Sequence, residues 1–275
     1  MRVLVAGAGY VGAELACRLA DAGHDVLALR RTRAAGAERA DGESGGRLRW
    51  LACDLADSRA LGELALEGVD ALTYLVAATA REDAAYRRAY VDCLANLLER
   101  LRAHSTLRRV LYASSTSVYA QDDGSRVDES SATEPREFNG RRVLEGEAIA
   151  RSAGCCAVAL RLGGIYGPGR SALQERVRAG AARLPSAPHY TNRIQRDDAA
   201  RACAHLLALA APATCYVGVD REPADRAAVL RWLAVRLGAP PPPGDYDAHA
   251  PPSGKRCDSA RLLATGFDFA YPTFR

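Results

Sequence analysis

The chain has little or none of the residues that several common kinds of site require. Among its 37 basic residues only Lys255 is a lysine, so no lysine is available for chemistry before that position. No tyrosine occurs between Tyr119 and Tyr166. No apolar run approaches the roughly 20 residues that a membrane-spanning helix needs. We therefore expect no membrane segment and no lysine-dependent chemistry in most of the chain.

Cysteine spacing and charge exclude further classes of protein. The 8 cysteines are scattered without a Cys-x-x-Cys pair, and the 5 histidines do not cluster with them. This pattern indicates reduced thiols, with no metal site and no disulfide framework. The net charge of +4 is spread along the chain, so we expect no nucleic-acid partner. The glycine spacing near the start favours a strand and a turn over a targeting segment, and we expect a cytoplasmic protein.

Apolar strands alternate with amphipathic helices through the first half of the chain. This pattern predicts an α/β fold, with a doubly wound parallel (Rossmann) sheet that is covered on both faces. We expect a dinucleotide-binding core over 1–163. A small C-terminal substrate lobe over 164–275 is interleaved with it. The expected strands are 2–7, 25–30, 48–55, 70–77, 108–115 and 156–163, and the expected helices include 82–104, 171–182, 196–210 and 224–237.

The segment GAGYVG follows the first strand and opens a helix, which is the context that a dinucleotide-binding turn requires. Gly7 permits the tight turn, Gly9 lets the backbone approach a pyrophosphate, and Gly12 allows close packing of helix on strand. Tyr10 and Val11 complete the turn, and the helix N-terminus presents N–H groups to the anion. The segment therefore predicts a nicotinamide dinucleotide cofactor.

The end of the second strand favours NADP over NAD. Enzymes that use NAD place a carboxylate there to bond the ribose hydroxyls, but this chain has Arg30 and Arg31, followed by Arg33. Guanidinium groups bind a 2′-phosphate with charge-assisted hydrogen bonds, whereas a carboxylate would repel it.

Over nearly its whole length the chain resembles an extended short-chain dehydrogenase/reductase of the NAD-dependent epimerase/dehydratase type. The resemblance rests on GAGYVG, SSTSVY (114–119), RLGGIYGPGR (161–170) and NRIQRDDAA (192–200), together with shorter segments. It implies a small-molecule substrate and a homodimer formed through the helices at 82–104 and near 139. Site residues implied by it are Asp54 and Leu55 at the adenine, Ala77, Ala78 and Thr79 at the ribose and phosphate, Gly163 to Ile165 at the nicotinamide, Ser115 as the catalytic hydroxyl, and Arg170 and Arg193 at the substrate.

The chain departs from this family where the family's catalytic tyrosine and lysine would lie. One register places Asn139 and Val143 at these positions, and a register one residue earlier places Phe138 and Arg142 there. Neither register restores the pair. The glycine turn is also one residue shorter than usual, and an asparagine common on the long helix is replaced near Tyr90.

Three hypotheses remain open. The chain is an oxidoreductase or epimerase whose proton donor is Tyr166, Ser115 or water, with Arg142 near the ribose. Alternatively it is a non-catalytic NADP(H)-binding sensor, or it uses the cofactor structurally in non-redox chemistry on a sugar-nucleotide-like ligand. We assign Glu145 and Glu147 to a solvated helix face, and Asp197 and Asp198 to the cap of the following helix.

Overall fold

The computed structural model of the chain describes residues 1–32, 46–102 and 106–275. Their contacts divide the chain into two compact units. Unit 1 comprises Met1–Val118, Thr133–Arg161 and Ala199–Tyr216, and unit 2 comprises Tyr119–Ala132, Leu162–Asp198 and Val217–Arg275.

A seven-stranded parallel sheet forms the core of the dinucleotide-binding fold, as predicted. The spatial order of its strands is β11-β7-β5-β4-β1-β2-β3. The chain reverses direction across the sheet between β1 and β4, and open α/β sheets bind their ligands at such a switch point. The strands are β1 (Arg2–Ala6), β2 (Asp25–Arg30), β3 (Leu48–Ala52), β4 (Ala71–Tyr74), β5 (Arg109–Ser115), β7 (Cys156–Leu162) and β11 (Cys215–Gly218).

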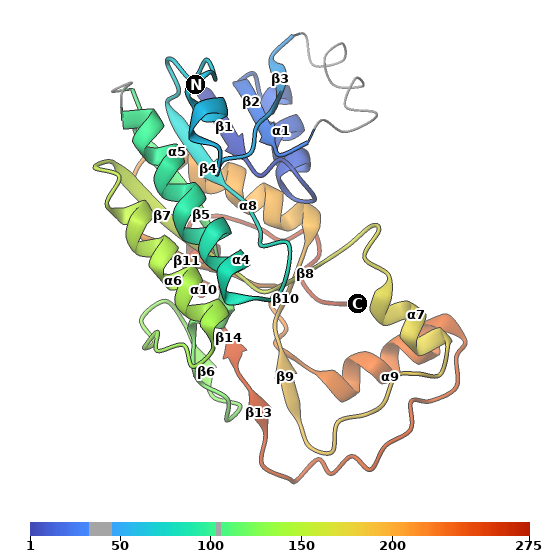
Figure 1. The fold of residues 1–275 in the computed structure, drawn as a ribbon. Helices are drawn as coiled ribbons and strands as arrows, with labels where there is room; N and C mark the ends of the chain where they lie inside the picture. Colours follow the sequence, from blue (N-terminus) through green and yellow to red (C-terminus); the bar gives the residue numbers. More distant parts are fainter. Residues whose placement is uncertain (33–45, 103–105) are drawn as a thin grey trace. The chain divides into compact units, whose positions relative to one another are not determined.

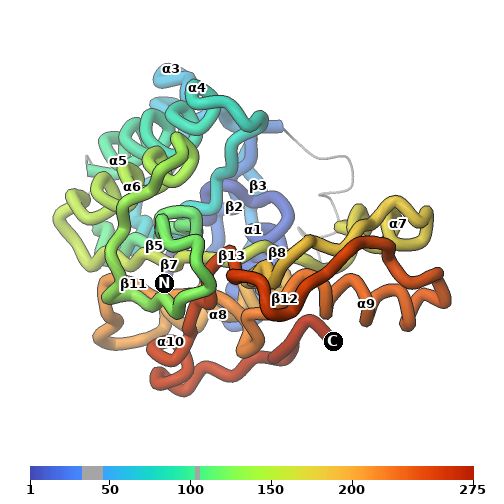
Figure 2. Tube along the Cα trace, turned by 90° about the horizontal axis from the view of Figure 1, so that it is seen from below, coloured from blue at the N-terminus to red at the C-terminus, as the bar shows by residue number. Residues whose placement is uncertain are grey.

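Helices flank this sheet (Figure 1). The central strands are continuous apolar runs because helices cover both faces, and Val3 to Ala6 of β1 have no exposed surface at all. Helices α5 and α6 lie side by side in both views (Figures 1 and 2). The helices are α1 (Gly12–Asp21), α3 (Ser58–Gly62), α4 (Asp83–Arg87), η2 (Arg88–Asp92), α5 (Cys93–Arg102), η3 (Thr116–Val118), α6 (Phe138–Arg151) and α8 (Arg196–Ala208).

Unit 2 is built from short strands and three helices among the described residues. Val177, Leu230 and Phe274 belong to its apolar core. Its elements are β6 (Arg126–Val127), β8 (Gly164–Tyr166), α7 (Ala172–Arg178), β9 (His189–Thr191), β10 (Arg193–Gln195), β12 (Ala224–Asp225), α9 (Arg226–Leu237), β13 (Ser253–Gly254), β14 (Arg256–Cys257) and α10 (Ala260–Ala264).

Several predicted elements are shorter than their apolar patterns. The strand expected over 48–55 ends at Ala52, because the Asp54 carboxylate accepts the N–H of Ala56 at 3.0 Å and turns the chain out of the sheet. The helix expected over 82–104 is interrupted by five π-helical residues, 88–92. Such insertions occur often at functional sites.

Candidate cofactor and substrate sites

Glycine is required at two positions of the turn after β1. Gly7 has a φ of +91°, and a Cβ on it would lie 2.5 Å from the carbonyl carbon of Leu75. A Cβ on Gly12 would collide with the Gly7 carbonyl oxygen. A Cβ on Gly9, by contrast, would meet only the Gly7 oxygen, at 4.0 Å. Gly9 therefore borders open space, which suits the close approach of a pyrophosphate to the backbone.

The N-terminus of α1 also suits an anion. Val11 is its N-cap residue, and no side chain caps the helix. The first N–H groups of a helix have no intrahelical acceptor and carry a partial positive charge. The predicted residues Tyr10 and Val11 lie directly before this terminus. The turn and the helix together have the features that a dinucleotide phosphate requires.

Arg30 is the last residue of β2. Its guanidinium lies over the ring of Trp50, with 5.8 Å between the guanidinium carbon and the ring centroid. Stacking on an aromatic face orients a guanidinium while its edge stays able to donate. Arg31 is exposed beside it. Arg33 lies outside the described residues.

Asp54 and Leu55 follow β3. The Asp54 carboxylate accepts hydrogen bonds from the guanidinium of Arg88 at 2.7 Å and from the Ala56 N–H. Leu55 is buried, and its carbonyl accepts from the side chain of Asn96 at 3.2 Å. These contacts fix the loop after β3, although the carboxylate is already paired with a cation.

The segment after β4 contains Ala77 to Thr79, of which Ala77 and Thr79 are exposed. The backbone of Ala78 lies near the hydroxyl of Tyr90 on η2. Burial raises the pKa of this tyrosine to about 12, and the backbone of Ala78 acts in the opposite direction by lowering the pKa of the hydroxyl. The π-helical turn therefore places Tyr90 beside the segment after β4, which the sequence pattern alone does not indicate.

Phe138 and Asn139 of α6 are the residues that the two registers place at the tyrosine position. Neither carries a hydroxyl. Phe138 packs edge-on against Tyr86, with ring centroids 5.5 Å apart, and Tyr86 lies 5.3 Å from Tyr90. Val143 is buried in the core. Phe138 and Val143, one from each register, thus take part in packing, and neither carries a hydroxyl.

The guanidinium of Arg142, predicted to lie near the ribose, is already paired with two carboxylates. Its guanidinium makes two hydrogen bonds to the carboxylate of Asp83, at 2.8 and 2.9 Å. It also reaches both carboxylate oxygens of Glu145, at 2.9 and 3.0 Å. These acids already neutralise the charge that the predicted role would use.

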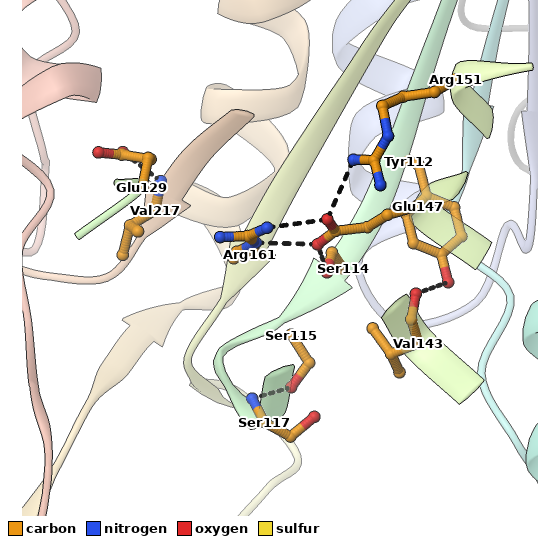
Figure 3. A network of polar contacts seen from close by, with 10 residues as sticks. All are labelled: Tyr112, Ser114, Ser115, Ser117, Glu129, Val143, Glu147, Arg151, Arg161 and Val217. Atoms are coloured by element: carbon orange, nitrogen blue, oxygen red, sulfur yellow. Dashed lines mark hydrogen bonds and ion pairs between the residues drawn. The ribbon is translucent and has the colours of Figure 1, made fainter. Parts of the chain in front are cut away.

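Ser115 is the last residue of β5 and is half-buried. Its hydroxyl oxygen accepts the N–H of Ser117 at 3.1 Å (Figure 3). This bond fixes the rotamer of Ser115 at the start of η3 and leaves the hydroxyl hydrogen able to donate, since a hydroxyl is both donor and acceptor.

Glu147 does not lie on a solvated face, contrary to the prediction. It is 1% exposed, and Figure 3 shows its carboxylate held by three side chains. Arg161 donates to both oxygens at 2.9 Å, Ser114 donates at 2.5 Å, and Arg151 donates at 3.3 Å. Burial alone would raise the pKa of Glu147, but the hydrogen bonds and charge of Arg161 lower it. Ser114 precedes Ser115, so this buried network fixes the end of β5.

Tyr166 lies in β8 of unit 2. Its hydroxyl donates to the Thr273 carbonyl at 3.1 Å. Burial, with the nearby carboxylates Asp220 and Asp198, raises its pKa far above the usual range. A phenol with a raised pKa gives up its proton less readily. Both features speak against Tyr166 as the proton donor.

The two arginines predicted for the substrate differ in their surroundings. Arg170 is exposed, and its guanidinium donates to the Ile165 carbonyl at 2.8 Å. Arg193 lies over the ring of Phe274, 6.0 Å from its centroid, and burial lowers its pKa. The nearby Asp220 is 2% exposed, and burial raises its pKa to about 7. The structure therefore surrounds Arg193 with other ionisable groups.

Backbone contacts within unit 2 explain the glycines after β7. A Cβ on Gly163 would lie 2.9 Å from the carbonyl oxygen of Asn192. The N–H of Gly164 donates to the same oxygen at 2.9 Å. The segment that contains Gly163 to Ile165 is therefore held by β10 and the residue before it, since β8 and β10 pair in parallel.

Asp198 does not precede helix α8, as the predicted cap would, but lies in its first turn. Its two carboxylate oxygens accept the N–H groups of Ala270 and Tyr271, at 3.0 and 2.8 Å. The side chain thus anchors the C-terminal segment, a contact over more than seventy residues.

None of the helices in residues 1–32, 46–102 and 106–275 has the length and hydropathy of a membrane span. In the same part of the chain no three His, Cys, Asp or Glu residues gather as metal ligands would.

In a comparison with protein families, residues 3–188 match the NAD dependent epimerase/dehydratase family. The chain belongs to this family. A putative NAD-dependent epimerase/dehydratase from Methylobacillus flagellatus is 33% identical, with a TM-score of 0.82, and the match covers 99% of this chain and 94% of that one. The comparison with curated proteins found no match.

More distant solved structures share the fold and were determined with a cofactor. The human epimerase family protein SDR39U1, solved with NADPH, is 18% identical with a TM-score of 0.77; the match covers 99% of this chain and 96% of that one. DesIV, a dTDP-glucose 4,6-dehydratase from Streptomyces venezuelae solved with NAD, is 22% identical with a TM-score of 0.79. That match covers 100% of this chain and 93% of DesIV. At these identities the likeness shows the fold alone.

Proposed function

We propose that the chain is an NADP(H)-binding oxidoreductase or epimerase acting on a small, sugar-nucleotide-like substrate, with a proton donor other than the tyrosine of its family. The assignment of a dinucleotide cofactor rests on the open space beside Gly9, next to a helix N-terminus that no side chain caps. Arg30, where enzymes that use NAD have a carboxylate, supports the choice of NADP. The human structure solved with NADPH is consistent with it.

The residues present have the chemistry to hold this cofactor. The glycine turn and α1 would bind the pyrophosphate, Arg30 and Arg31 the 2′-phosphate, and the loop at Asp54 and Leu55 the adenine. Ala77 to Thr79 would line the ribose and phosphate, and Gly163 to Ile165 the nicotinamide. When bound, the nicotinamide supplies or accepts a hydride. We assign to Ser115 a hydrogen bond to the reacting oxygen of the substrate.

The substrate class is supported by the shared fold. One neighbour with 22% identity, MoeE5, was solved with UDP-glucuronic acid and NAD. We propose that Arg170 and Arg193 bind the anionic part of a related ligand, since guanidinium groups pair with phosphate in two parallel hydrogen bonds.

A screen of sugar nucleotides and small carbonyl compounds, with NADPH consumption as readout, tests this function. Because Ser115 would act on the reacting oxygen, Ser115→Ala should lower kcat at least about tenfold and leave NADPH affinity unchanged. Ser58→Ala, an exposed serine of unit 1, is the matched control. Turnover that is the same in both variants would contradict the assignment of Ser115.

The sensor hypothesis is the second candidate, and the side chains on α6 favour it. Phe138, Asn139 and Val143 offer no phenol, and the charge of Arg142 is paired. Under this hypothesis no substrate is consumed, and NADPH instead changes the affinity for a protein partner. Absence of turnover with tight NADPH binding would favour the sensor over the enzyme.

A further inference from the structure

Lys255 is the one lysine in a chain that otherwise uses arginine for every basic position. An arginine guanidinium cannot release its proton in a protein, whereas a lysine ammonium can. A lysine in such a background differs from its neighbours in being able to release a proton. The surroundings of Lys255 provide the independent evidence.

The backbone at Lys255 is held on both sides. Lys255 joins β13 to β14, which pair with β9 and β6 respectively. The preceding Gly254 has a φ of +75°, and a Cβ on it would collide with the Tyr190 carbonyl oxygen. Its N–H donates to the carboxylate of Asp122 at 2.7 Å. The side chain of Lys255 therefore extends from a fixed point of unit 2.

The ammonium of Lys255 donates to the carbonyl oxygen of Tyr119 at 2.6 Å. Tyr119 directly follows η3, the turn that begins after Ser115. The bond orients the amine at the end of the SSTSVY segment.

Asn192 connects Lys255 to the segment proposed for the nicotinamide. Its side-chain amide donates to the Lys255 carbonyl at 2.9 Å and accepts the N–H of Cys257 at 2.8 Å. Its own carbonyl accepts the N–H of Gly164. One residue thus links the lysine backbone to Gly164 within unit 2.

The electrostatic surroundings favour the release of a proton. Burial lowers the pKa of Lys255 and outweighs the opposing effects of Cys257 and Asp122. Burial also raises the pKa of the Cys257 thiol to about 12, so this neighbour is uncharged at neutral pH. The ammonium is therefore a stronger acid than an exposed lysine.

We propose that Lys255 is the proton donor and acceptor that replaces the family's tyrosine, acting on a substrate that carries an aldehyde or ketone. This proposal rests on the proposed oxidoreductase function. In the reductive direction the carbonyl π bond breaks, hydride from the reduced nicotinamide forms the new C–H bond, and a proton from Lys255 Nζ forms the O–H bond. The substrate is reduced to an alcohol and the nicotinamide is oxidised. The neutral amine then regains a proton from water.

Because the chain has a single lysine, ¹⁵N-lysine labelling gives one side-chain signal, which can be titrated directly by NMR. The matched control is the double variant Lys255→Arg/Arg178→Lys, which moves the only lysine to an exposed position on α7. We expect Lys255 to titrate at a lower pH than the control lysine. Addition of NADPH as probe should shift the Lys255 signal and not the control signal. Titration at the control pH, or no response to bound NADPH, would overturn the proposal.

Turnover provides the second readout. Lys255→Arg keeps the charge but replaces the amine by a guanidinium, which does not release a proton in a protein, so kcat should fall about 10²–10⁴-fold, the range of general acid–base catalysis. The limb of the pH–rate profile that belongs to Lys255 should disappear, while NADPH affinity stays at the wild-type value. Wild-type kcat and pH profile in Lys255→Arg would overturn the proposal and leave the proposed function standing. Failure of the wild-type chain to bind NADPH would contradict the proposed function itself.

Discussion

Replacement of Glu147 by glutamine should destabilise unit 1 far more than the small change in side-chain volume suggests. The substitution keeps the shape of the side chain but removes the charge that compensates Arg161, whose side chain is 7% exposed. Removal of one partner of a buried ion pair costs about 3–5 kcal/mol, because the other charge is left buried without compensation. Arg151 is 47% exposed, so its guanidinium can turn to water and adds little.

Glu145→Gln is the matched control. Glu145 lies on the same helix and also pairs with an arginine, but its side chain is 45% exposed. Such pairs contribute about 0–1 kcal/mol. Urea unfolding on a Trp232→Phe background measures the difference, because Trp50 then remains as the fluorescent reporter of unit 1. A loss in Glu147→Gln below about 1 kcal/mol, or equal to the control, would refute the reasoning.

The same variant has a pH signature. The folded-state pKa of Glu147 is lowered, so its contribution is present above the unfolded value near about 4.3 and is lost as the pH falls through the folded value. The difference between wild type and Glu147→Gln should therefore shrink in acid. A difference that stays constant down to pH about 2 would contradict the assigned ionisation.

Three further predictions concern other parts of the chain. Because burial raises the pKa of Asp220 to about 7, the stability that this residue contributes should fall as the pH rises from about 4 to about 7. The melting temperature of wild type relative to Asp220→Asn should therefore fall over this range; a constant difference contradicts the prediction. Gly9→Ala should weaken NADPH binding at least about tenfold and leave the melting temperature of the free protein unchanged. Gly12→Ala should lower that melting temperature. Equal effects of the two variants contradict the geometry of the turn. Light scattering should show a homodimer, and a monomer at micromolar concentration contradicts it.

The sheet could be predicted from the sequence because its strands are buried on both faces. Continuous apolar runs such as those of β1 and β2 are typical of strands in a parallel sheet that helices cover on both faces. The glycine turn could also be predicted, because the local backbone geometry requires glycine at Gly7 and Gly12. Features fixed by neighbouring residues are thus visible in the sequence.

Features that depend on distant partners were not visible. A glutamate on an arginine-rich helix suggests a solvated face, whereas Glu147 is buried against Arg161, on a strand fourteen residues later, and Ser114. Asp198 binds a segment more than seventy residues away. The position of Lys255 at the Tyr119 carbonyl depends on the folding of unit 2. Sequence spacing contains no information on such pairings.

Calorimetric titration of the wild-type chain with NADPH and with NADH tests the central claim most directly. Because Arg30 stands where a carboxylate would hold the ribose diol, we expect NADPH to bind at least tenfold more tightly, a difference of about 1.4 kcal/mol. Arg30→Asp should reverse or abolish the preference, and Arg59→Ala, at a side chain that is 92% exposed, should leave it unchanged. Equal affinities of the wild-type chain for the two cofactors, or tighter binding of NADH, would contradict the account.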